Sequence, residues 1–74
     1  MTGQVLRNRV RERREELGLS QDELAVESEV GRTTVKAVER GEVPSGTVML
    51  KLATALQSRV QDLFYSESAE QVPA

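Results

Sequence analysis

The sequence predicts an all-α domain of five short helices. Three observations lead to this fold class: apolar residues recur at three- and four-residue spacing, glycine or proline stands where several such stretches stop, and no stretch alternates as a strand does. The 74 residues suffice for one small domain. We expect that domain over residues 1–65, followed by a flexible tail or the start of a linker over residues 66–74.

The first helix is expected over residues 5–17 and the second from residue 20. Gly18 ends the first helix, as glycine commonly does just past a helix. Ser20 and Glu23 form a capping box, in which the serine hydroxyl accepts from the Glu23 amide and the Glu23 carboxylate accepts from the Ser20 amide. The core stripe of the first helix consists of Leu6, Val10 and Leu17.

Three more helices are expected before the tail. The third covers residues 32–40 and stops at Gly41. Ser45, directly after Pro44, is expected to cap a fourth helix that reaches residue 56. A short last helix is expected around residues 60–64. The inward-facing residues are Val35 and Val38 in the third helix and Met49, Leu52, Ala53 and Leu56 in the fourth.

The chain contains no cysteine and no histidine. The first absence excludes disulfides and cysteine-based zinc sites, and the second removes the commonest general base and metal ligand. We therefore expect neither an enzyme nor a cofactor or metal site. The apolar runs are too short to cross a membrane and the N-terminus lacks the apolar stretch of a signal peptide, so we expect a cytoplasmic protein with no membrane partner.

Charge is unevenly distributed, although the net charge is only −2. Arginines crowd the first helix, where glutamates interleave with them, and we interpret most of these arginines as a solvated helix face. A second basic group recurs at four-residue spacing and therefore lies on one face of the third helix. The first group is Arg7, Arg9, Arg11 and Arg13, and the second is Arg32, Lys36 and Arg40.

The second and third helices are joined by a turn of only three or four residues. This is the helix-turn-helix arrangement, whose second helix enters the DNA major groove. Ala25 is small enough to let the two helices cross closely, and Val30 is an apolar anchor in the turn. Because Val35 and Val38 face the core, the outward face of the third helix is left polar, short-chained and basic, as a groove-reading face should be.

The motifs in and after this segment resemble the phage-repressor type of helix-turn-helix family, which includes the lambda repressor, Cro and the xenobiotic-response-element regulators. The resemblance covers about residues 5–64 and preserves the spacing throughout. The matching stretches are residues 19–25 (LSQDELA), 34–35 (TV), 38–41 (VERG), 44–45 (PS), 50–56 (LKLATAL) and 62–64 (DLF).

The resemblance implies a lambda-repressor-like domain that binds double-stranded operator DNA as a homodimer at two half-sites, with the third helix in the major groove. Base contacts are expected from Arg32, Thr33 and Lys36. Phosphate and backbone contacts are expected from Gln21, Thr34, Arg40, Ser45 and Thr47. Arg14 and Glu39 flank core stripes, where the family carries a structural ion pair.

Four residues depart from the family pattern. Glu29 replaces a turn glycine where φ tends to be positive, which costs about 1 kcal/mol or forces another turn. Gly31 replaces a Ser or Thr cap at little cost. Ala37 replaces a polar base-reading residue, and Gln57 replaces the glycine after the fourth helix.

The expected function is transcription regulation by a sequence-specific DNA-binding protein, a repressor or autoregulator found at the nucleoid when bound. An antitoxin would share the fold and add a protein partner, for which the acidic patch in the second helix is available. A protein-interaction module that has lost DNA binding is a further alternative. The patch comprises Asp22, Glu23, Glu27 and Glu29. The chain could also be the N-terminal module of a longer protein.

Overall fold

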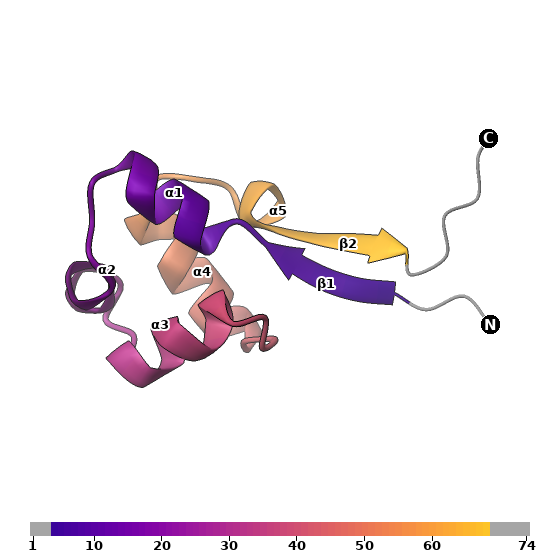
Figure 1. Ribbon diagram of the computed structural model, residues 1–74, viewed down its shortest axis with the longest axis horizontal. Coiled ribbons are helices and arrows are strands. Elements are labelled where there is room, and N and C mark those ends of the chain that lie inside the picture. The colour runs from indigo at the N-terminus through magenta and orange to yellow at the C-terminus, as the bar shows by residue number, and fades with distance from the viewer. Residues whose placement is uncertain (1–3, 69–74) are drawn as a thin grey trace.

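The computed structural model describes residues 4–68 and contains five helices and one two-stranded sheet (Figure 1). The helices form the compact body of the molecule, and the sheet extends away from it as a ribbon. In chain order the elements are β1 (Gln4–Asn8), α1 (Val10–Glu16), α2 (Gln21–Ser28), α3 (Arg32–Glu39), α4 (Gly46–Ala55), α5 (Val60–Leu63) and β2 (Phe64–Ser68).

The sheet corrects the all-α prediction. β1 and β2 pair antiparallel, with a register from Gln4 opposite Ser68 to Asn8 opposite Phe64. The sequence predicts a helix over residues 5–8, but this stretch is too short for its apolar spacing to separate helix from strand. The partner strand of β1 lies at the other end of the domain, so no pattern within residues 5–8 predicts the pairing.

Asn8 determines where α1 begins. Its side-chain oxygen accepts from the Val10 amide at 3.1 Å, and its side-chain nitrogen donates to the Val38 carbonyl at 2.9 Å. Asparagine side chains that bond nearby backbone groups favour helix starts over helix interiors. The helix therefore starts at Val10, and Asn8 also joins the end of β1 to α3.

The prediction of a flexible tail is wrong for residues 66–68. Residues 66–68 belong to β2 and pair with β1. Residues 69–74, the rest of the expected tail, lie outside the described residues.

The core lies where the apolar stripes of the helices meet. Leu24, Val35, Leu52 and Leu56 are fully buried between α2, α3 and α4. Met49 is only partly buried and packs against this core. Burying these side chains contributes about 1.5–3 kcal/mol for each Val or Leu. The complete buried apolar set is Val10, Leu24, Val30, Val35, Val38, Leu52, Ala53, Leu56, Leu63 and Phe64.

Candidate nucleic-acid interface

A three-residue turn connects α2 to α3. Glu29 ends α2 in the left-handed conformation, with φ 58° and ψ 33°, so the positive φ expected at this position is present. Gly31 precedes α3 with φ −61° and ψ 146°, which is the extended conformation of an N-cap residue. Val30, between them, is buried with 7% of its surface exposed. The turn therefore holds α3 against α2 and leaves the other side of α3 facing outward.

The capping box at the start of α2 is confirmed. The Ser20 hydroxyl accepts from the Glu23 amide at 3.0 Å, and the Glu23 carboxylate accepts from the Ser20 amide at 2.8 Å. Hydrogen bonding to the Glu23 carboxylate from Ser20, first from its backbone amide and then from its side chain, lowers the pKa of Glu23. The first turn of α2 is therefore firmly defined, and Gln21 occupies its first position.

A buried ion pair links α1 to α3. Arg14 Nε lies 2.7 Å from Glu39 Oε2, and Arg14 Nη2 donates to Glu39 Oε1 at 3.1 Å. Only 11% of the Arg14 side chain and 6% of the Glu39 side chain are exposed. Arg14 Nη1 also donates to the Leu19 carbonyl at 2.8 Å. The hydrogen bond to Glu39 is the main cause of the raised pKa of Arg14, so this guanidinium stays charged although it is buried.

Gln21 is tied to the same carboxylate. Its side-chain nitrogen donates to Glu39 Oε1 at 3.1 Å, a contact that the sequence did not indicate. Three helices therefore meet at Glu39, because Arg14 comes from α1, Gln21 from α2 and Glu39 from α3. This network fixes the start of α2 relative to α3.

The outward side of α3 carries the residues expected to contact bases. Arg32 and Thr33 are exposed, while Thr34 and Lys36 are half-buried. Arg32 Nε lies 3.2 Å from Asp22 Oδ1 in an exposed pair. The only carboxylate on α3 is that of Glu39, which the ion pair occupies. The solvent-facing side of α3 is thus polar and basic.

The expected second phosphate-binding segment leads into α4. The Ser45 hydroxyl accepts from the Val48 amide at 3.2 Å, so Ser45 caps α4 as predicted. Thr47 is exposed in the first turn of α4. Arg40 ends α3 and is also exposed, with Nη2 lying 3.1 Å from Glu42 Oε2.

Two arginines of the crowded group have structural partners that the sequence did not reveal. Arg13 Nε donates to the Leu56 carbonyl at 3.0 Å and to the Ser58 hydroxyl at 3.1 Å, and so secures the C-terminal end of α4. The Arg9 guanidinium lies 4.8 Å from the centre of the Tyr65 ring. The interpretation of Arg13 as merely solvated is therefore wrong, whereas Arg9 is exposed as expected and adds a contact with the ring. Their partners are backbone groups or distant residues, which spacing cannot identify.

Within residues 4–68, no group of carboxylate side chains forms a metal site. In the same part of the chain, no helix combines the length and the apolar character that crossing a membrane requires.

A family model described as "Helix-turn-helix" matches residues 10–63. The chain is 38% identical over 63 residues to a Bacillus subtilis (strain 168) protein named "Uncharacterized HTH-type transcriptional regulator YgzD", covering 84% of this chain and 96% of that protein. It is 36% identical over 66 residues to an Archaeoglobus fulgidus protein named an HTH-type transcriptional regulator, covering 88% and 94% of the two chains.

A Methanothermobacter thermautotrophicus protein with the same kind of name is 41% identical over 61 residues, covering 80% of this chain and 88% of its own. The match spans α1 to α5, and the relatives are aligned over most of their length. The family is one of DNA-binding regulators rather than enzymes. The chain thus belongs to the Cro/C1-type helix-turn-helix family of DNA-binding transcriptional regulators.

Proposed function

We propose that the protein is a repressor that binds a palindromic operator as a homodimer, with α3 of each subunit in the major groove. The observation that carries this proposal is the surface of α3: Arg32 and Thr33 are exposed, Lys36 is half-buried beside them, and the single carboxylate of the helix is occupied by Arg14. Such a surface offers donors to base edges without repelling phosphates.

The residues of this surface have different roles in the proposal. Arg32 stands at the start of α3, where its guanidinium can exchange the exposed contact with Asp22 for the O6 and N7 acceptors of a guanine. Thr33 and Lys36 contact neighbouring bases and the nearby backbone. Because Ala37 provides no polar group on this side, few base positions are read directly.

The phosphate contacts position α3 without carrying sequence information. Gln21 and the adjacent amides face one backbone at the N-terminus of α2, where the helix dipole favours an anion. Thr34 and Arg40 contribute from α3. Ser45 and Thr47 bring the N-terminus of α4 to the second backbone segment.

A dimer is proposed because α3 is short. Its eight residues extend over about 12 Å, which spans only part of one turn of DNA. Two apolar side chains, Val43 and Leu50, are unusually exposed, at 67% and 62%, and a dimer interface that included them would cover this apolar surface. Half-sites should then be centred about 34 Å apart.

Selection of bound sequences from a random duplex library, using the purified protein, tests this proposal. We expect a two-fold symmetric site whose half-sites lie one helical turn apart, and two protein subunits on each saturated duplex. Recovery of an asymmetric single half-site, saturated by one subunit, would contradict the dimer. Recovery of no enriched sequence would contradict operator binding altogether.

An antitoxin-like role with a protein partner is the second candidate, and one observation favours it. Val26 on α2 is 78% exposed, and Asp22, Glu23 and Glu27 surround it. An apolar residue within an acidic helix face suits a partner with a basic, partly apolar surface. This role would be supported if a basic protein co-purifies in stoichiometric amount and the Val26→Ser variant no longer retains it. If no such protein co-purifies, only the operator-binding function remains.

A further inference from the structure

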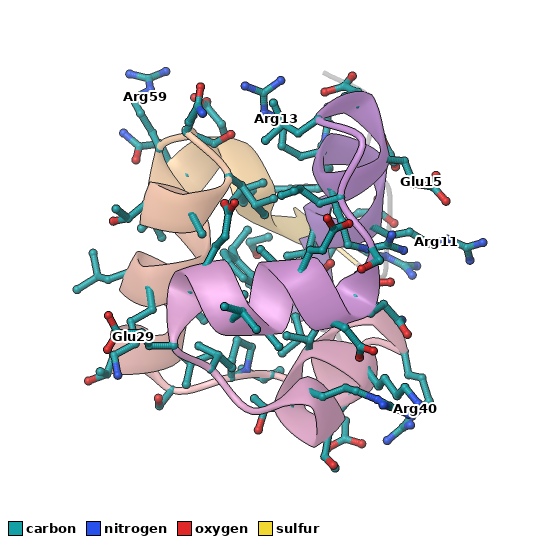
Figure 2. All side chains as sticks on the ribbon, turned by 90° about the vertical axis from the view of Figure 1, so that its left-hand side faces the viewer. Arg11, Arg13, Glu15, Glu29, Arg40 and Arg59 are labelled. Carbon is teal, nitrogen blue, oxygen red and sulfur yellow. The ribbon has the colours of Figure 1, made fainter. Side chains whose placement is uncertain are left out.

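Arginines from three elements meet on the side of the molecule beside the C-terminal end of α3. They line a surface hollow of about 500 Å³, to which β1 contributes Arg7, α1 contributes Arg11, and the end of α3 contributes Arg40. Figure 2 shows Arg11 and Arg40 directed outward on the same side of the molecule. The fold thus brings together cations that are well separated in the sequence.

The carboxylate partners of these arginines hold them weakly. The contacts are Arg7–Glu67 at 3.5 Å, Arg11–Glu15 at 3.4 Å and Arg40–Glu42 at 3.1 Å, and all six side chains are between 45% and 70% exposed. Ion pairs this exposed contribute little to stability. The guanidiniums can therefore exchange these carboxylates for another anion at little cost.

The hollow is continuous with the surface around α3. A second hollow of about 400 Å³ shares Arg11 and Arg40 and is also lined by Gln21 and Lys36. Glu39, which borders both hollows, already accepts from Arg14 and Gln21. Glu12 also lines the first hollow, where it stands against the three arginines. A basic path therefore runs from the start of α2, along α3, to β1.

We propose that Arg7 and Arg11, together with Arg40, bind phosphates of the DNA backbone beyond the bases that α3 contacts. This inference rests on the proposed function and extends it, because β1 precedes residues 10–63, the part that the family model matches. Arg7 and Arg11 are then phosphate-binding residues rather than a solvated face. The ribbon lengthens the interface without adding base readout.

The test measures affinity for the selected operator as a function of salt concentration. Removing one arginine–phosphate interaction lowers the slope of log K against log salt by about 0.9. We expect Arg7→Gln and Arg11→Gln each to show this reduction, and the double variant to show a reduction of about 1.8. The ranking of single-base operator variants should stay unchanged, because phosphate contacts carry no sequence information.

Arg59→Gln is the matched control. Arg59 is 72% exposed, pairs with Asp62 at 2.9 Å, and lies on the opposite side from Arg11 and Arg40 (Figure 2). Its replacement changes the net charge by the same amount and should leave the slope as in the wild type. A urea midpoint equal to that of the wild type establishes that each variant is folded.

Duplex length gives a second measurement. A duplex shortened to the two half-sites lacks the flanking phosphates that Arg7 and Arg11 would bind. It should therefore lower the slope of log K against log salt for the wild type but not for the Arg7→Gln/Arg11→Gln variant. Slopes equal to the wild type for both single variants would overturn the inference while leaving the proposed function intact. A wild-type protein that binds no DNA of any sequence would overturn both.

Discussion

Arg14 and Glu39 make the most heavily buried charged contact described in the structure, and its removal has a calculable cost. In Arg14→Met, Glu39 keeps only the Gln21 amide as a donor, and the Leu19 carbonyl loses its partner. In Glu39→Met, the Arg14 side chain, only 11% exposed in the wild type, remains in place without its carboxylate. Breaking a buried pair by removing one partner costs about 3 kcal/mol or more.

This loss is large for so small a domain. At about 0.05–0.15 kcal/mol per residue, 74 residues give a free energy of unfolding of roughly 4–11 kcal/mol. With an m value of about 1 kcal/mol/M, each single variant should unfold at a urea concentration about 3 M lower. Arg14→Met/Glu39→Met leaves no unpaired charge and should be destabilised no more than either single variant. The coupling free energy is then at least about 3 kcal/mol.

Arg11 and Glu15 provide the matched control for this double-mutant cycle. They form an i,i+4 pair at 3.4 Å, but 70% and 57% of their side chains are exposed. Their coupling should be about 0.5 kcal/mol or less. A coupling between Arg14 and Glu39 no larger than that of the control pair would refute the reasoning that burial makes this contact strong.

Two further predictions concern the helix ends. Glu29 and Gln57 have φ values of 58° and 52°, so Glu29→Gly and Gln57→Gly should each raise the free energy of unfolding by about 1 kcal/mol; unchanged urea midpoints would exclude strain at these positions. Because the hydrogen bonds with Ser20 lower the pKa of Glu23 below 4.5, the capping box stabilises the fold above that pH, and this contribution disappears as the pH falls through the folded-state pKa. Glu23→Gln should be less stable than the wild type at neutral pH and approach it under acid, whereas a constant difference would contradict the linkage.

The features that the sequence predicted correctly depend on neighbours in the chain. The capping box needs only Ser20 and Glu23, which lie within one helical turn, and both hydrogen bonds are present. The positive φ at Glu29 was expected from the family resemblance, because Glu29 stands at the position of the family's turn glycine. The outward side of α3 could be predicted because burial of Val35 and Val38 leaves a single orientation for the helix.

The features that the sequence did not predict depend on distant partners. The β1–β2 ribbon joins the two ends of the domain. Each strand is too short for its apolar pattern to distinguish a strand from a helix. The sequence places Arg13 and Gln21 only by their position on a helix, yet their partners are the Leu56 carbonyl and the Glu39 carboxylate. Such interactions depend on how helices cross, which the periodicity of one helix does not specify.

Base discrimination by Arg32 tests the central claim most directly. Arg32→Ala and Gln21→Ala are titrated against the selected operator and its single-base variants at two salt concentrations. Gln21→Ala should weaken binding to all sequences by a similar factor. Arg32→Ala should reduce discrimination by about 1–3 kcal/mol at one position in each half-site. If Arg32→Ala instead keeps the full base preference at every operator position, α3 does not read DNA through Arg32 and the account is contradicted.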